Sequence, residues 1–218
     1  MKIVSRFYLM VLLTFYPFAL HAVTTPTTIF MKVYQVAVSN NALCTNPVTI
    51  FKTDTPTFVD FIANPTLGSG SIAAGTYNCV IIEIESVVKF KPQANVGVNC
   101  VAGVEVSMPI CSGGDYSGKT YTLLDGTTGD CSGSQVRRVP LVLSTAANCV
   151  GTGPNCDATA FPFGIPIDTS GTSKNGLKLT TGMVVSAAAT VNFTVDGRNQ
   201  VNDAGTRCVM EAPVFSFQ

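Results

Sequence analysis

The sequence contains one histidine, His21, and no tryptophan. His21 lies at the end of a segment that we expect to be removed, so the mature chain has no imidazole. Without an imidazole, the Ser-His-Asp and Cys-His arrangements of many hydrolases cannot form, nor can a Cys2His2 zinc site. The absence of tryptophan, the ring best suited to broad apolar contact, argues mildly against sugar-binding and glycosidase functions.

Charged residues are also scarce, at 12% of the chain. The formal net charge is 0, and it becomes −2 if residues 1–22 are removed, because two basic residues leave with them. This balance gives no electrostatic reason to expect nucleic acid or an anionic membrane surface as a partner. Arg137-Arg138, the densest basic spot, is expected to be a solvated strand edge.

The N-terminal residues have the order of a secretory signal peptide. Lys2 and Arg6 precede an apolar run, Phe7–Leu20, after which the chain becomes rich in Thr and Pro. This order predicts a signal peptide over residues 1–22, cut after Ala22.

A membrane anchor is the alternative to a signal peptide. The apolar run would rise about 21 Å as a helix, against a hydrocarbon core of about 30 Å, and Pro17 interrupts it. No later apolar stretch reaches about 18 residues. We therefore expect an exported protein, periplasmic, on the outer surface or extracellular, with no transmembrane segment after signal removal.

The cysteines include no C-x-x-C pair. Zinc sites and thiol oxidoreductases need such close pairs, so we expect neither. Eight cysteines in an exported chain instead indicate disulfide bonds. Cys149–Cys156 and Cys111–Cys131 would each close a local loop, and Cys44–Cys79 and Cys100–Cys208 complete the set as guesses. The candidates are Cys44, Cys79, Cys100, Cys111, Cys131, Cys149, Cys156 and Cys208.

Helical periodicity is nearly absent after residue 22, and strand signals recur instead. In the longest run, Thr76–Lys91, alternate residues form an apolar face, and the other face, with Glu83, Glu85 and two lysines, is expected to be solvated. Further strands are expected over 29–38, 48–52, 57–62, 101–109, 120–124, 138–143, 177–185, 188–195 and 207–217.

Asn-Gly and Asp-Gly pairs at 125–126, 175–176 and 196–197 mark tight turns between these strands. The spacing predicts an all-β fold, an antiparallel β-sandwich of immunoglobulin-like or prealbumin-like type with long disulfide-pinned loops. We expect one domain over residues 23–218, with two sheet modules meeting near residue 96 as the alternative.

Four segments carry a resemblance to a known group of proteins. Ala74-Gly75-Thr76-Tyr77 leads into a long apolar strand, and 177–179, 183–185 and 190–196 follow near the C-terminus. Together they resemble bacterial exported domains of unknown function with a prealbumin-like or carboxypeptidase-regulatory-like β-sandwich. The resemblance implies a sandwich fold at or beyond the cell surface, with no chemistry to carry over. The cysteines are not part of that pattern.

Residues Gly113–Thr120 match the phosphate-loop pattern G-x-x-x-x-G-K-T. That function needs a buried strand before the loop and a helix after it, whose N-terminal N–H groups hold the phosphates. Here Pro109 and Cys111 interrupt the preceding strand, and Tyr121–Gly126 have a strand-and-turn pattern. We expect a glycine-rich loop between strands and no nucleotide cofactor.

Two Ser-Lys pairs, Ser117 with Lys119 and Ser173 with Lys174, are the near neighbours that nucleophilic catalysis could use. Both lie in Gly/Ser-rich loops, where we expect lysine to stay solvated and unable to act as a base. Carboxylate pairs could cleave glycosidic bonds, but sequence spacing does not say which acids face each other.

Asp196, Asn199, Asn202 and Asp203 supply oxygen atoms within one turn, which suggests calcium as one interpretation. The spacing departs from that of an EF-hand loop, so we favour a simple hairpin turn and expect no metal. Asn192-Phe193-Thr194 matches a glycosylation acceptor but falls inside an expected strand.

These observations favour a structural or interaction protein exposed on or beyond the cell envelope, and no enzyme. Low charge with abundant Val, Ile and Thr predicts strand edges that pair with protein partners or with further copies of the chain. One alternative is a module that binds a small ligand or glycan through the long loops around residues 145–176. Another is a hydrolase that uses carboxylates or a Ser-Lys pair.

Overall fold

The computed structural model describes residues 22–63, 72–111, 118–133, 136–147, 163–164, 175–186 and 193–217. All regular secondary structure in these residues is strand, which confirms the all-β prediction. No helix in this part of the chain is long and apolar enough to cross a membrane. The first strands are β1 (Val23–Thr24), β2 (Pro26–Ser39), β3 (Val48–Lys52), β4 (Phe58–Asp60), β5 (Gly75–Tyr77), β6 (Cys79–Glu85), β7 (Val87–Pro92) and β8 (Val106–Pro109). The later strands are β9 (Thr120–Thr122), β10 (Thr128–Asp130), β11 (Arg138–Ser144), β12 (Leu177–Lys178), β13 (Met183–Val185), β14 (Phe193–Asp196), β15 (Val201–Asp203), β16 (Cys208–Met210) and β17 (Val214–Phe217).

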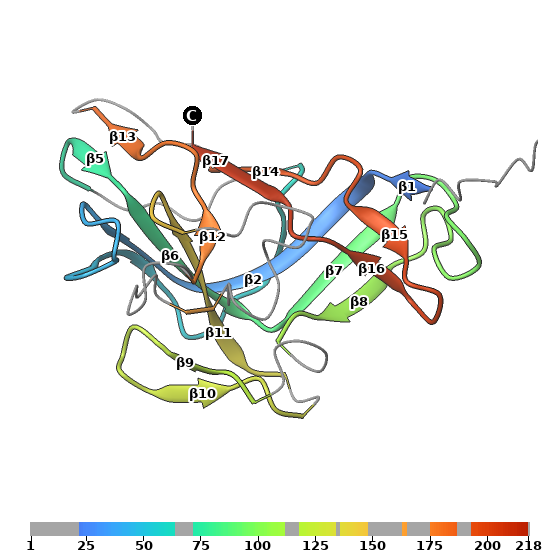
Figure 1. Cartoon of the computed structure of the whole chain (residues 1–218), viewed down its shortest axis with the longest axis horizontal. Coiled ribbons are helices and arrows are strands. Elements are labelled where there is room, and N and C mark those ends of the chain that lie inside the picture. The colour runs from blue at the N-terminus through green and yellow to red at the C-terminus, as the bar shows by residue number, and fades with distance from the viewer. Residues whose placement is uncertain are drawn as a thin grey trace, which may run out of the picture.

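The long strand β2 is central to a sheet of eight strands (Figure 1). β6 and β7 lie end to end along one side of β2, and β3 and β4 lie along its other side. Farther out, β11 pairs with β6, β8 pairs with β7, and β12 pairs with β11. The β11–β12 pairing is parallel, so the sheet is mixed and not purely antiparallel as predicted.

The apolar pattern of β2 changes phase in the middle of the strand. The β2 residues in the main apolar core are Ile29, Met31 and Val33 in the first half, then Val36 and Val38 in the second. The register with β6 shifts directly after Val33, where β2 has an extra residue. Because a bulge reverses the alternation that follows it, both halves direct these side chains into the same core.

The single strand predicted over residues 76–91 is wrong, because the structure divides this segment into β5, β6 and β7. The break between β6 and β7 is at the buried residue Ser86. Its N–H donates to the carbonyl of Arg137 at 2.7 Å, and its carbonyl accepts from the N–H of Ile110 at 2.8 Å. Arg137 precedes β11 and Ile110 follows β8. At Ser86 the outer neighbour therefore changes from β11, which pairs with β6, to β8, which pairs with β7.

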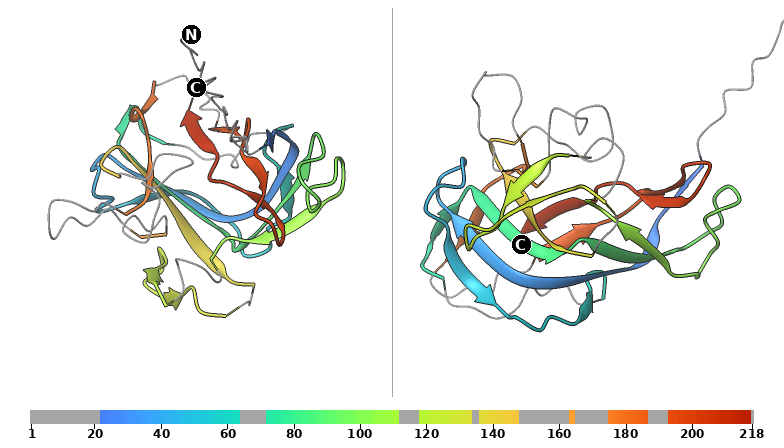
Figure 2. Two further views of the ribbon diagram at one scale, coloured as in Figure 1. Left: turned by 45° about the vertical axis from the view of Figure 1, so that its right-hand side comes forward. Right: turned by 90° about the horizontal axis from the view of Figure 1, so that it is seen from below.

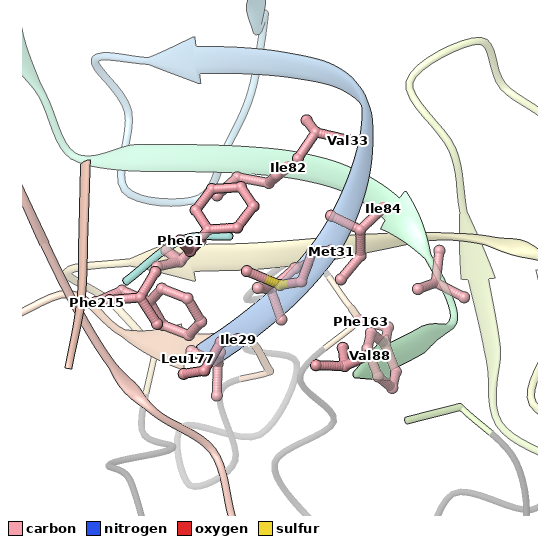
Figure 3. Packing of buried hydrophobic residues seen from close by; sticks show 14 of the residues in the cluster. Ile29, Met31, Val33, Phe61, Ile82, Ile84, Val88, Phe163, Leu177 and Phe215 are labelled. Carbon is pink, nitrogen blue, oxygen red and sulfur yellow. The ribbon is translucent and has the colours of Figure 1, made fainter. Parts of the chain in front are cut away.

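A second layer of short strands lies against the concave side of the large sheet (Figure 2). It contains the antiparallel pairs β14–β17 and β15–β16, and β5 pairs with β13. The main apolar core brings Ile82 and Ile84 of the sheet into one cluster with Phe215 of β17 (Figure 3). The fold is therefore sandwich-like, and residues on both sides of position 96 contribute to this core.

A smaller apolar cluster lies on the opposite face of the large sheet. It contains Cys44, Cys79, Ile81 and Val142, with Leu124 packed against it. Leu124 belongs to the turn between β9 and β10, which pair as a hairpin below β11 in Figure 1. The convex face of the sheet is therefore partly covered by this hairpin.

Three of the predicted disulfide bonds are confirmed: Cys44–Cys79, Cys100–Cys208 and Cys111–Cys131. The first ties the loop after β2 to β6, and the second ties the loop after β7 to β16. The third closes the segment that contains β9 and β10. Cys149 and Cys156 lie outside the described residues, as does most of the excursion predicted over 145–176.

Candidate functional site

Glu83 is fully buried on the convex face of β6, although the sequence predicted a solvated face. The N–H of Leu124 donates to Oε1 of Glu83 at 2.5 Å, and the guanidinium of Arg138 pairs with Oε2. Arg138 also donates to the side-chain oxygen of Gln35 at 3.0 Å. The prediction failed because the β9–β10 turn, far along the chain, covers this position.

The Glu83–Arg138 pair fastens the β9–β10 hairpin to the sheet. Besides the bond from Leu124, the hydroxyl of Tyr121 in β9 donates to the backbone carbonyl of Arg138 at 3.0 Å. Burial raises the pKa of the Tyr121 hydroxyl, so this donor stays protonated at neutral pH. Both carboxylate oxygens of Glu83 are engaged, one by the N–H of Leu124 and one by Arg138. The arrangement therefore supports a role in holding the hairpin more than a role as general acid or base.

Glu85, the second predicted solvated acid, is also buried and pairs with Lys32 of β2 at 2.8 Å. The hydrogen bond that Lys32 donates to this carboxylate raises the pKa of Lys32. Lys32 and Lys89 both lie over the ring of Phe58, at 4.7 and 4.9 Å from its centroid. The charge of Glu85 on β6 is therefore matched by Lys32 on the neighbouring strand β2.

The Arg137-Arg138 pair is not a free basic edge. Arg137 bonds to the carbonyl of Asp130 and donates to the carbonyl of Ser132 at 2.7 Å. Its guanidinium also lies 3.1 Å from the carboxylate of Asp130. Both arginines therefore hold backbone and side chains of the β9–β10 region in place.

The end of the phosphate-loop motif, Gly118 to Thr120, leads into β9, which pairs antiparallel with β10. A phosphate-binding loop would lead into a helix, whose N-terminal N–H groups hold the phosphate. The structure thus confirms that a strand and not a helix follows the motif. Residues 112–117 lie outside the described part of the chain.

The residues of the suggested calcium turn bind different partners. The carboxylate of Asp196 accepts hydrogen bonds from Nε of Arg198 at 3.0 Å and from Nη2 at 2.6 Å, and this pairing lowers the pKa of Asp196. The side-chain N–H of Asn202 donates to Glu211 at 3.0 Å. Asn199 adopts a positive φ of 58° in the turn. No group of three or more acidic, histidine or cysteine side chains suited to a metal occurs among the described residues.

Asp203 holds the loop that follows β7. Its carboxylate accepts hydrogen bonds from the N–H of Val98 at 2.8 Å and the N–H of Asn99 at 3.0 Å. It also accepts from the side-chain amide of Asn99 and the N–H of Gly205, both at 2.8 Å. The bonds from Asn99 are the main cause that lowers the pKa of Asp203 from 3.8 to about 2.

The loop that Asp203 holds carries three exposed valines, which we call the apolar tip: Val98, Val101 and Val104. The sequence predicts a strand over 101–109 that includes part of this segment, but β8 begins only at Val106. A signal for the tip is visible in the sequence, because residues 92–104 contain no charged side chain. Lys91 and Glu105 flank this uncharged stretch.

Strand β3 forms an outer edge of the large sheet. Within the described residues β3 pairs only with β2, and β4 also pairs only with β2. Val48 of β3 is 59% exposed. The edge at β3 and β4, which we call the open edge, offers unpaired backbone groups, and the apolar tip offers apolar contact; β8 and β12, at the two ends of the strand order, are further edges of the same sheet.

Several predicted site residues lie outside the described part of the chain. They are the serine of the first Ser-Lys pair, Ser117, both residues of the second, Ser173 and Lys174, and the glycosylation candidate Asn192. Those interpretations stay predictions, as does the signal peptide over residues 1–22.

No protein-family model, curated protein or solved structure matches this chain. The resemblance to exported prealbumin-like domains therefore stays a prediction.

Proposed function

We propose that this chain is an exported structural or interaction protein of the cell envelope or extracellular space. It works by contact with other protein chains and not by chemistry on a small substrate. The open edge formed by β3 and β4 is the observation that supports this function best.

An edge strand presents a row of N–H and C=O groups that can bond to a strand of another chain. β3 continues the large sheet on the far side of β2 and carries Val48, Thr49 and Lys52 as exposed residues. Lys52 opposes indiscriminate pairing, because a charged side chain at an edge disfavours aggregation. An open edge that carries a charged residue fits a selective contact with another protein better than uncontrolled self-association.

The disulfide bonds support export. Three bonds staple loops to strands in the described structure. Such bonds form and persist in oxidising compartments and are rare in the cytosol. Together with the predicted signal peptide, they support a place outside the cytoplasm.

Sedimentation velocity and co-sedimentation with envelope fractions test the proposal. Purified residues 23–218 should self-associate or bind envelopes in a saturable way. Val48→Lys should weaken that association, because it adds a charge at the open edge. The matched control is Val136→Lys, which adds the same charge at a loop residue with a similar exposure of 62%. A strict monomer that binds no envelope fraction would contradict the proposal.

The two alternative functions have no comparable support. The glycan- or ligand-binding alternative depends on loops around 145–176 that lie largely outside the described residues. For the hydrolase alternative, the carboxylates of Glu83 and Glu85 are both engaged in ion pairs.

A further inference from the structure

The loop over residues 96–104 is fixed by several bonds although it exposes three apolar side chains. Val96 and Cys100 point inward and are buried, and their backbones bond to each other at 3.0 and 3.3 Å. The Cys100–Cys208 disulfide fixes the loop to β16, and Asp203 fixes its backbone from β15. The loop projects between β7 and β8 at one end of the molecule (Figure 1).

Further bonds hold the second half of the same loop. The N–H of Ala102 donates to the side chain of Asn95 at 2.7 Å, and the N–H of Gly103 donates to the carbonyl of Pro92 at 2.8 Å. A disulfide, a carboxylate and these bonds therefore fix one short loop in one shape. A surface fixed before binding loses little conformational entropy when a partner binds.

The exposed valines are concentrated on this loop. The exposed fractions are 86% for Val98, 48% for Val101 and 53% for Val104. Ten large apolar residues are exposed in the described part of the chain, and three of them lie in this loop. Single exposed apolar residues are ordinary, but a cluster on a preformed loop indicates a contact surface.

The charge around the tip indicates the class of partner. No charged residue occurs from Pro92 to Val104, and the flanking Glu105 is neutralised by Lys89 at 2.8 Å. Surfaces that bind anionic membranes combine basic residues with Trp, Phe or Leu, and the tip has neither. An uncharged apolar groove on another protein matches it better than a lipid headgroup layer does.

The area of the tip indicates that the partner is not a second tip. Burying a valine side chain removes on the order of 60–120 Å² of apolar surface, so three remove less than about 400 Å². A stable interface needs about 800 Å² from each partner. Two convex tips in contact would fall short, whereas a groove that surrounds the tip also gains contacts with the neighbouring loops.

We infer that the apolar tip is a preformed docking element whose three valines insert into an uncharged apolar groove of a different protein. This inference rests on the proposed function, to which it adds a second contact surface beside the open edge and the kind of partner that this surface binds.

Site-specific photo-crosslinking tests the inference. A photoreactive residue replaces Val98, or Val136 as the control, in cells that naturally produce the protein. The expected result is an adduct with one distinct protein at position 98 and none at position 136. Once purified, that protein should bind Val98→Asp at least about tenfold more weakly than it binds the wild type. Val136→Asp should bind like the wild type, and equal melting temperatures will show that all variants are folded.

Three outcomes of the crosslinking and vesicle experiments would overturn the inference. They are an adduct with a second copy of the chain, flotation of the protein with phosphatidylethanolamine–phosphatidylglycerol vesicles, and no adduct at position 98. If envelopes still bind Val98→Asp as well as the wild type, the tip is not the docking element but the proposed function stands. If the wild type binds no envelope and stays a monomer, the proposed function itself fails.

Discussion

At the scale of single residues, one carboxylate organises a whole loop. Asp203 accepts hydrogen bonds from Val98, Asn99 and Gly205, and these favour its charged form. Its pKa falls from 3.8 to about 2 in the folded protein. A group with a depressed folded pKa stabilises the fold above its unfolded pKa and loses that effect as the pH falls through the folded pKa.

The stability of the wild type should therefore decrease as the pH falls from 3.8 to about 2, in part through protonation of Asp203. Asp203→Asn should melt at a lower temperature at neutral pH and show a shallower loss over that interval. Melting temperatures measured across this pH range check both statements. Parallel curves for the two proteins would show that Asp203 does not act in this way.

The approach of Asp203 requires glycine at position 97. Gly97 has a φ of +57°, and a Cβ there would lie 2.7 Å from the Cβ and Cγ of Asp203. Gly103, in the same loop, has a φ of +73° and open space around it. Gly103→Ala should cost about 1 to 2 kcal/mol for the backbone conformation alone. Gly97→Ala should cost more, because it also displaces the carboxylate, and equal losses in chemical denaturation would argue against this contact.

The buried Glu83–Arg138 pair can be compared with the exposed Glu105–Lys89 pair. Glu83→Gln removes the buried carboxylate that pairs with Arg138 and leaves the guanidinium only the more distant carboxylate of Asp125, at 3.9 Å, which should destabilise the fold by about 3 kcal/mol. Glu105→Gln makes the same chemical change in the exposed pair with Lys89 and should have little effect. Urea denaturation measures both. Glu83→Gln with wild-type stability would mean that the pair does not fasten the hairpin.

At the scale of strands and loops, the disulfides differ in the length of chain that they close. Cys111 and Cys131 are separated by 20 residues, and Cys100 and Cys208 by 108. Loop-closure entropy predicts a contribution of about 3 kcal/mol for a short loop and about 4.7 kcal/mol for a long one. Replacing Cys100 and Cys208 by serine should thus lower the denaturation midpoint more than the same change at Cys111 and Cys131. The reverse order would contradict this entropic account.

The sequence predicted strands well where β-branched and apolar residues form a run between turn residues. Val48–Lys52 was expected as it is found, and the strand expected over 138–143 ends one residue later, at Ser144. It missed β1, β10 and β15, which are two or three residues long and form only through pairing with other segments. A local pattern cannot show such pairing; Val23, for example, pairs with Asn202.

The candidate surfaces were harder to predict than the strands. The burial of Glu83 depends on a bond from Leu124, 41 residues away, which no local alternation indicates. The apolar tip depends on Asp203, which accepts a bond from Val98 across 105 residues of sequence. In both cases a segment far away in the sequence determines the surroundings of the residue. The local sequence pattern therefore predicted those surroundings wrongly.

At the scale of the whole molecule, a curved sheet, a covering layer and three disulfides form a rigid frame. The frame leaves a sheet edge open at β3 and presents a tip without charged side chains at residues 98–104. Its buried charges are paired within the fold, which gives them a structural role. This distribution suits a protein that acts by contact with other proteins.

The most direct test is the binding of labelled residues 23–218 to washed envelopes, measured against concentration with and without prior protease treatment of the envelopes. A contact between proteins predicts saturable binding that protease treatment abolishes. Binding that rises linearly with concentration and survives protease treatment, from a chain that stays monomeric, would contradict the account.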